Sequence, residues 1–245
     1  MKTAVITGGT GATGLAIARA LIQEGYAVGL IHRGDSAKAQ EHAEALGAHC
    51  RAYQADISDA ETTARAIDAV ESELGPITVV VHAASERIAR GDASEVTPAA
   101  FRQEFEPSVF GAFNLAHALL PKLRSREGAL FVAITTDLIE SGKTPSRIPG
   151  YISSKCALHA FLRSLAKDTQ GSTLRVNALA PDLMDTPFSS DLPRKLFEWA
   201  AERDPRGRIT TPDDVAEKLR YLLSPAGSQV SGMSLSVATD HVEPL

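Results

Sequence analysis

A phenol and an ammonium group stand four residues apart in this chain, at Tyr151 and Lys155. On a helix such residues lie one above the other on the same face, so the two groups are expected to be neighbours. Proton exchange near neutral pH needs a phenol pKa about 3 below its usual value of about 10, or ~4 kcal/mol.

A cation about 4 Å from the phenol supplies that free energy at an effective dielectric near 20, but only about 1 kcal/mol in bulk water. Burial alone acts in the opposite direction, because desolvation raises the pKa of a phenol. The pair is therefore expected to make an acid/base catalyst only in a partly closed site where the charge of Lys155 outweighs desolvation. An exposed tyrosine beside a lysine describes most such pairs, so the interpretation depends on the surrounding elements.

The beginning of the chain has the order of elements that a phosphate-binding loop requires. An apolar strand is expected over residues 3–6, and the helix that follows the loop ends at Gly25. Between them lies Thr7-Gly8-Gly9-Thr10-Gly11-Ala12-Thr13-Gly14. Glycines let the backbone approach a pyrophosphate at the positive end of the helix. A flexible turn is the alternative, but both flanks favour a nucleotide site.

The tip of the second expected strand, over residues 28–31, indicates which dinucleotide binds. An acidic residue there would accept the ribose hydroxyls of NAD, whereas this chain has His32 and Arg33. Arg33 could hold a 2′-phosphate with Ser36 or Lys38 assisting, which predicts NADPH. Asp35 lies near enough to the strand tip that NADH binding stays the weaker alternative. The alternative for Arg33 is a solvated loop arginine without a ligand.

Strand and helix patterns alternate along the rest of the chain. Further strands are expected over residues 50–54, 78–82, 129–135, 174–179 and 235–238. Further helices are expected over residues 37–46, 60–74, 101–120, 150–165 and 213–223, with the third disturbed at Pro107 and stopped near Pro121. This alternation predicts one α/β domain over residues 1–245, a doubly wound Rossmann-type fold with about seven parallel strands in the order 3-2-1-4-5-6-7 and helices on both faces. An eight-fold barrel is the alternative.

Two segments beside the expected carboxyl edge of the sheet are expected to line the ligand site. The strand over 78–82 runs into Ala83, Ala84 and Ser85, whose small side chains would let a flat ring pass close to the sheet. Residues 186–212 are polar and interrupted by prolines, which predicts a substrate-binding flap, with a plain surface excursion as the alternative. His82 is expected to be a core residue, and the seven histidines lack metal-ligand spacing, so no metal is predicted.

Composition excludes several classes of function. The net charge is −5 without clusters of Lys and Arg, which argues against a nucleic acid or an anionic membrane as partner. No apolar run approaches the ~18 residues of a membrane span, and no signal peptide is evident. Cys50 and Cys156 are the only cysteines, which fits small core residues in a reducing cytoplasm.

Six motifs together resemble the short-chain dehydrogenase/reductase family, in the family's order and over residues 2 to about 238. They are the Thr7–Gly14 turn, Asp56-Ile57, Tyr151 with Lys155, Arg175-Val176-Asn177, Pro181 with Thr186, and Gly207-Arg208 leading into Pro212. One family pattern has glycine where this chain has Ala12, but the spacing of Gly8, Gly11 and Gly14 fits the family's other pattern.

The resemblance implies a set of catalytic roles. Tyr151 would be the general acid/base, and Lys155 would lower its pKa and hold the nicotinamide ribose. Thr136 would replace the usual serine that hydrogen-bonds the substrate oxygen, although it lies fifteen residues before Tyr151 and Leu138 stands at the usual spacing. Ser108 stands where the family has an asparagine that completes a proton relay. For the cofactor, Asp56 and Ile57 would contact adenine, and Thr186, with Pro181 before it, the carboxamide.

These roles predict an NADPH-dependent reductase of a ketone or aldehyde on a small-molecule or acyl-carrier-linked substrate. A dinucleotide-binding sensor without redox turnover is one alternative, and an isomerase or lyase that uses Tyr151 as proton donor is another. The resemblance also implies a homodimer or homotetramer, formed through the apolar helices around residues 109–120 and 161–165.

Overall fold

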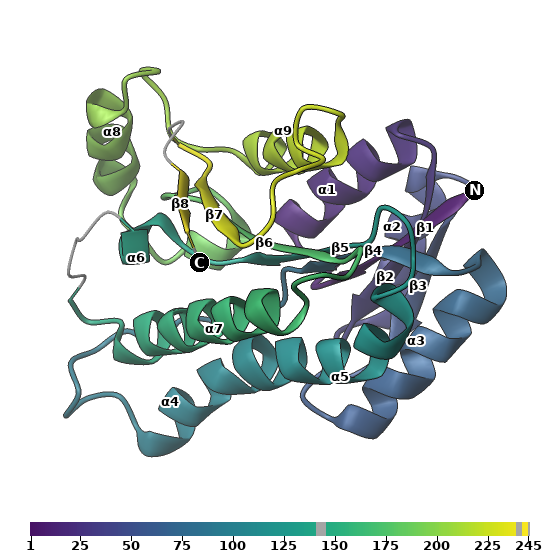
Figure 1. Cartoon of the computed structure of the whole chain (residues 1–245). Helices are drawn as coiled ribbons and strands as arrows, with labels where there is room; N and C mark the ends of the chain where they lie inside the picture. The colour runs from purple at the N-terminus through teal and green to yellow at the C-terminus, as the bar shows by residue number, and fades with distance from the viewer. Residues whose placement is uncertain (141–145, 239–241, 245) are drawn as a thin grey trace.

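The computed structural model describes residues 1–140, 146–238 and 242–244, and these residues form an α/β domain around one sheet (Figure 1). Its strands are β1 (Lys2–Thr7), β2 (Tyr26–His32), β3 (Cys50–Gln54), β4 (Ile77–His82), β5 (Leu130–Ile134), β6 (Arg175–Ala180), β7 (Met233–Ser236) and β8 (Val242–Pro244). Their order is β3-β2-β1-β4-β5-β6-β7-β8, with β1 to β7 parallel and β8 antiparallel to β7. The expected seven-strand order is confirmed, and β8 is an addition that the sequence did not indicate.

Helices cover both faces of this sheet. They are α1 (Ala12–Gln23), α2 (Ser36–Leu46), α3 (Ala60–Leu74), α4 (Pro98–Phe105), α5 (Gly111–Leu123), α6 (Asp137–Glu140), α7 (Pro149–Asp168), α8 (Arg194–Arg203) and α9 (Pro212–Leu223). Figure 1 shows α1 and α9 packed together on one face, while α3, α5 and α7 cover the other. None of the helices that the structure describes has the length and apolar composition needed to cross a bilayer.

Alternation along the central strands divides the core into two aliphatic layers. On β4, Val79 and Val81 belong to the layer under α1 and α9, whereas Val80 belongs to the layer under α3, α5 and α7. All three are completely buried. Successive side chains of a strand point to opposite faces, and a parallel sheet covered on both faces must therefore be apolar throughout.

The register of the strands brings their carboxyl ends to one edge. Thr7 at the end of β1 pairs with Ile31 of β2 on one side and with His82 of β4 on the other. On the far side of β4, Ile134 of β5 pairs with Leu179 of β6. The loops that follow these strands consequently meet at one edge of the sheet, where the predicted site residues lie.

The helix predicted over residues 101–120 is interrupted at the predicted disturbance, Pro107. Between α4 and α5 the residues Glu106–Phe110 form a π-helix, in which the Gly111 amide donates to the Glu106 carbonyl. Pro107 has no amide hydrogen to donate to the preceding turn, which accounts for the wider turn at this point. The expected stop near Pro121 is wrong, because Pro121 lies in the last turn of α5 and the helix continues to Leu123.

The expectation for the two cysteines is half right. Cys50 is buried at the start of β3, but Cys156 is exposed on α7. The helical rotation that buries Lys155 turns the next residue outward, since adjacent positions on a helix lie about 100° apart.

Candidate active site

A cleft of about 1140 Å³ lies along the carboxyl ends of the strands. The loops after β1, β2, β4, β5 and β6 line it together with α8. The cleft crosses the point between β1 and β4 where the strand order reverses, which is the usual ligand site of an open parallel sheet.

At one end of the cleft the glycine loop leaves no room for side chains. Gly8 has a φ of +65°, and a Cβ there would lie 2.9 Å from the Ala83 carbonyl. A Cβ on Gly14 would lie 2.4 Å from the Gly8 oxygen. Gly11 begins α1 without a side-chain cap, and the Leu15 amide is the first to bond back to the Gly11 carbonyl at 2.9 Å. The intervening amides of the first turn have no intrahelical acceptor, which suits an anion such as a pyrophosphate.

The charged groups beside β2 form the next part of the cleft. Arg33 lines it with His32 and Lys38, and the Arg33 guanidinium donates to Oε2 of Glu86 at 2.7 Å. Asp35 accepts a hydrogen bond of 2.8 Å from the Ala37 amide and so caps α2. The Asp35 carboxylate is thereby used as the N-cap of α2. Arg33 and Lys38 remain as the charged residues of this segment that line the cleft and could bind a ligand.

Most of the predicted cofactor residues line this one cleft. The group comprises Gly8, Thr10, Gly11, Ala12, Thr13, Gly14, His32, Arg33, Asp56, Ile57, Ala83, Ala84, Ser85, Lys155, Pro181 and Thr186. Ser36 was expected to assist Arg33, but it begins α2 and does not line the cleft. The Ser36 expectation is therefore unsupported, and Lys38, two residues further along, occupies the position facing the cleft.

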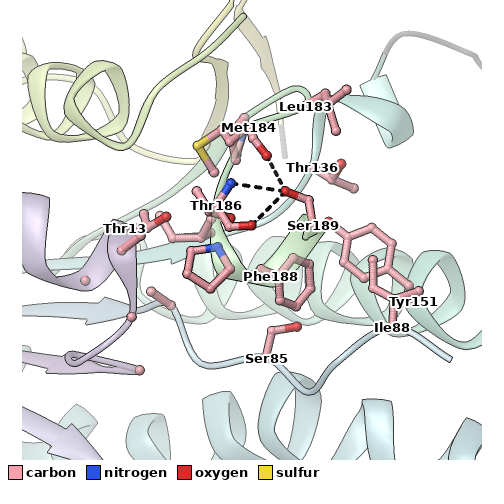
Figure 2. A pocket seen from close by; sticks show the side chains of 18 of the residues that line it. Thr13, Ser85, Ile88, Thr136, Tyr151, Leu183, Met184, Thr186, Phe188 and Ser189 are labelled. Atoms are coloured by element: carbon pink, nitrogen blue, oxygen red, sulfur yellow. Dashed lines mark hydrogen bonds between the residues drawn. The ribbon is translucent and has the colours of Figure 1, made fainter. Parts of the chain in front are cut away.

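The other end of the cleft holds the phenol and its partners (Figure 2). Thr136 lies beside the phenol of Tyr151, near enough for its hydroxyl to lower the phenol pKa, so Thr136 rather than Leu138 takes the place next to Tyr151. Lys155 is buried on the next turn of α7, donates to the Ile134 carbonyl at 2.8 Å, and has Nζ 5.9 Å from the centre of the Tyr151 ring.

Desolvation dominates the titration of this pair. Burial raises the pKa of Tyr151 above its usual value, the neighbouring Thr136 hydroxyl lowers it, the charge of Glu104 raises it and that of Arg90 lowers it. Burial also lowers the pKa of Lys155 to about 8. The charge of Lys155 is not among the causes that lower the phenol pKa, because the ammonium is directed at a carbonyl of β5, so the condition that this charge outweigh desolvation is not met in this structure.

Ser108 lies in the π-helix behind the cleft, completely buried, and its Oγ has no hydrogen-bond partner among the described residues. Its carbonyl instead lies 3.0 Å from Nε2 of His82, whose Nδ1 lies 2.9 Å from the Thr7 hydroxyl. A carbonyl can only accept, so Nε2 carries the proton and Nδ1 accepts from Thr7. Burial lowers the pKa of His82 to about 3, so the ring is neutral. The core role expected for His82 is confirmed.

Residues 186–212 contribute a wall of the cleft, as expected for a flap. Leu196, Trp199 and Arg203 of α8 line it, with the Arg203 guanidinium 3.9 Å from the centre of the Trp199 ring. An ion pair between Arg90 and Asp191 ties this segment to the loop after β4.

Sequence patterns did not single out several residues that line this end of the cleft. These are Ile88, Arg90, Ile148, Leu183 and Met184, while Phe188 and Leu192 were covered only by the predicted segment 186–212. Most of them lie in connections between strands and helices, whose positions no periodicity predicts. Among the described residues, no group of three or more His, Cys, Asp or Glu side chains is placed to hold a metal ion.

Comparison with known proteins agrees with this geometry. A family model described as enoyl-(acyl carrier protein) reductase matches residues 11–239, nearly the whole chain. The chain belongs to the short-chain dehydrogenase/reductase family.

Relatives within the short-chain dehydrogenase/reductase family have varied substrates. The cis-4-hydroxycyclohexanecarboxylate dehydrogenase of Sinomonas cyclohexanicum is 33% identical over 241 residues, covering 96% of this chain and 94% of the relative. The 3-oxoacyl-[acyl-carrier-protein] reductase MabA of Mycobacterium tuberculosis is 26% identical, covering 96% and 91%. The crystal structure of a 3-ketoacyl-(acyl-carrier-protein) reductase from Brucella melitensis complexed with NADH has a TM-score of 0.88 at 26% identity and covers 96% of each chain.

Proposed function

We propose that this protein is an NADPH-dependent carbonyl reductase that converts a ketone or aldehyde into an alcohol. The observation that carries the proposal is the Tyr151 phenol, beside the Thr136 hydroxyl and one turn from the buried Lys155, at the far end of a cleft that begins with a glycine loop. The substrate is a small molecule or an acyl chain on a carrier, because the flap side of the cleft is mainly apolar.

The residues of this chain bind and orient the dinucleotide, which supplies the hydride when it is bound. Amides of the glycine loop would hold the pyrophosphate, and Asp56 and Ile57 would contact adenine. Ala83, Ala84 and Ser85 would leave room for the ribose beside β4. Thr186, with Pro181, would hold the carboxamide, and Lys155 would hold the ribose next to Tyr151.

The protein controls the proton. Thr136 and Tyr151 would both hydrogen-bond the substrate oxygen, and Tyr151 would give its proton to the oxygen as the carbonyl is reduced. A half-buried phenol whose pKa is raised stays protonated at neutral pH, which favours its role as proton donor. Ser108 as part of a proton relay stays a prediction.

NADPH is preferred over NADH in this proposal because the tip of β2 carries Arg33 and the nearby Asp35 is engaged in capping α2. A guanidinium binds a phosphate through paired hydrogen bonds, whereas it offers less to a ribose hydroxyl. The unpaired acidic residue that would select NAD at this tip is not present at His32 or Arg33.

Two further proposals concern the whole protein. The exposed rings of Phe110, at the end of the π-helix, and Phe113, on α5, would be covered by a second copy of the chain, giving a homodimer or homotetramer. A cytoplasmic location stays a prediction from the sequence.

Turnover tests the reaction directly. Purified protein should oxidise NADPH with at least one member of a panel of ketones, aldehydes and 3-oxoacyl thioesters, and Tyr151→Phe should reduce kcat at least 100-fold, within the range of general acid catalysis. Tyr221→Phe, at an exposed position on α9, is the matched control and should retain the wild-type rate. An undiminished rate in Tyr151→Phe contradicts the mechanism, and tight NADPH binding without turnover would favour the dinucleotide sensor.

A further inference from the structure

Glu104 is a buried carboxyl that the proposed reaction does not use. It lies on α4 with 3% of its surface exposed, and no pattern in the sequence marks this position as internal. Its Oε1 accepts a hydrogen bond of 3.0 Å from the Ala89 amide, and its Oε2 has no hydrogen-bond partner among the described residues. Buried carboxyls are normally paired, so an incompletely paired one requires an explanation.

The position of Glu104 at the start of the catalytic helix supplies that explanation. A Cβ on Gly150 would lie 2.8 Å from Glu104 Oε1, so the carboxyl fills the space that a side chain there would need. The next residue is Tyr151. The first turn of α7 has no acidic residue and Ile148 provides no side-chain cap, so Glu104 brings a carboxyl to this helix end from another element.

The same carboxyl reaches the substrate wall. Ala89 belongs to the loop after β4, and its neighbours Ile88 and Arg90 line the cleft. Through the Ala89 amide, Glu104 joins this wall to α4, which packs on α7. One side chain thus connects the substrate wall with the first turn of the helix that carries the phenol.

We propose that Glu104 is a positioning residue for Tyr151, holding the substrate wall against the first turn of α7 and controlling through its charge how readily the phenol releases its proton. The proposal rests on the acid/base role proposed for Tyr151. The proposal goes beyond that role because it assigns control of proton release by Tyr151 to Glu104, a residue outside the cleft.

The charges around Glu104 determine the sign of the effect. Burial raises the pKa of the Glu104 carboxyl. On the loop after β4, the charge of Glu86 raises this pKa further and the charge of Arg90 lowers it. Tyr151 on α7 is subject to Glu104 and Arg90, with Glu104 raising the phenol pKa and Arg90 lowering it. In the alkaline range where the phenol titrates, Glu104 is ionised. Removing its charge should therefore lower the pKa of Tyr151.

A titration of the phenol measures this coupling without any substrate. The tyrosinate absorbance of Tyr151 is obtained as the difference between each protein and its Tyr151→Phe counterpart. In Glu104→Gln, which keeps an oxygen to accept from Ala89, the midpoint should fall by roughly 0.5 or more. Glu127→Gln, an exposed carboxyl before β5 at the opposite edge of the sheet, is the control and should leave the midpoint unchanged. An unchanged midpoint in Glu104→Gln overturns the electrostatic part of the proposal.

A double-mutant cycle tests the steric part. Gly150→Ala should lower the Tm of the wild type by several degrees, but should lower it much less in the Glu104→Ala background, where the carboxyl is gone. Equal losses in both backgrounds would overturn the contact. Both readouts remain valid if the wild type reduces no carbonyl, so failure of the proposed reaction and failure of the Glu104 proposal are distinguishable.

Discussion

At the scale of single residues, Tyr151 and Lys155 are governed by their removal from water. The phenol pKa rises and the ammonium pKa falls to about 8, both because burial disfavours the charged form. At neutral pH the phenol therefore keeps the proton that the proposed carbonyl reduction would consume. The reverse reaction, alcohol oxidation, would require the phenolate and is accordingly expected to need a higher pH than the reduction.

In the proposed function, the preference for NADPH depends on Arg33. Arg33→Ala should reduce the preference for NADPH over NADH by about tenfold or more, because a hydrogen bond to a charged group contributes ~1.5–3 kcal/mol. Dissociation constants for both dinucleotides, measured by calorimetry on the wild type and the variant, test this. Equal wild-type affinities for the two dinucleotides would refute it.

Substitution of Glu86 should have the opposite effect on NADPH binding from substitution of Arg33. It pairs with Arg33 at 2.7 Å, and a 2′-phosphate would have to displace it. Glu86→Gln should tighten NADPH binding by up to about fivefold, the size of a partly exposed ion pair, and leave NADH nearly unchanged. Tighter binding of NADH alone would show that Glu86 does not compete with a phosphate.

At the scale of elements, α9 is held by a capping box in which Thr211 and Asp214 bond each other's amides, and Arg208 adds a bidentate pair to the Asp214 carboxylate. These bonds hold the pKa of Asp214 far below its usual range. Asp214→Asn should destabilise the fold by about 1 kcal/mol at neutral pH, as loss of a cap does. The adjacent Asp213→Asn, whose carboxylate is largely exposed, is the control and should have little effect.

The pH dependence of this effect follows from the direction of the shift. A carboxyl whose pKa is depressed on folding contributes stability above its unfolded pKa of about 4, and that stability is lost as the pH falls through the folded pKa. The difference in urea stability between the wild type and Asp214→Asn should therefore be full at pH 7 and shrink below about pH 4. A difference that stays constant over this range would assign the effect to packing.

Prediction from the sequence succeeded where a pattern is local. The α3 helix and the β3 strand were predicted at the residues where they lie, because caps, glycines and periodicity mark them. The disturbance at Pro107 was predicted but not its π-helical form, the burial of Cys156 was assumed against the helical rotation that turns it outward, and the antiparallel β8 was missed because it depends on pairing with β7. The residues of the site also fall into those that a local motif predicts and those that only the fold brings together. Motifs predicted the glycine loop and Tyr151, but nothing at Glu104 indicated that its carboxyl would reach Gly150.

At the scale of the whole molecule, the cleft and the exposed apolar rings lie on different parts of the sheet. Its carboxyl edge holds the cleft, while the face covered by α5 and α7 presents apolar rings outward. Phe113 is 53% exposed and its ring lies 6.1 Å from that of Phe161 on α7, so the two helices share one apolar surface. This surface is the one on which the proposed contact between subunits would form.

This surface predicts self-association through α5 and α7. Phe113→Glu places a charge in the centre of the surface, where burying it without a partner would cost several kcal/mol, and should convert the assembly to a smaller species. Sedimentation velocity over a range of concentrations measures the mass. Ala45→Glu, an exposed position on α2 on the opposite face of the sheet, is the control and should keep the wild-type mass. A wild type that sediments as a monomer, or a Phe113→Glu variant of unchanged mass, would show that the rings on this face are not the contact between subunits.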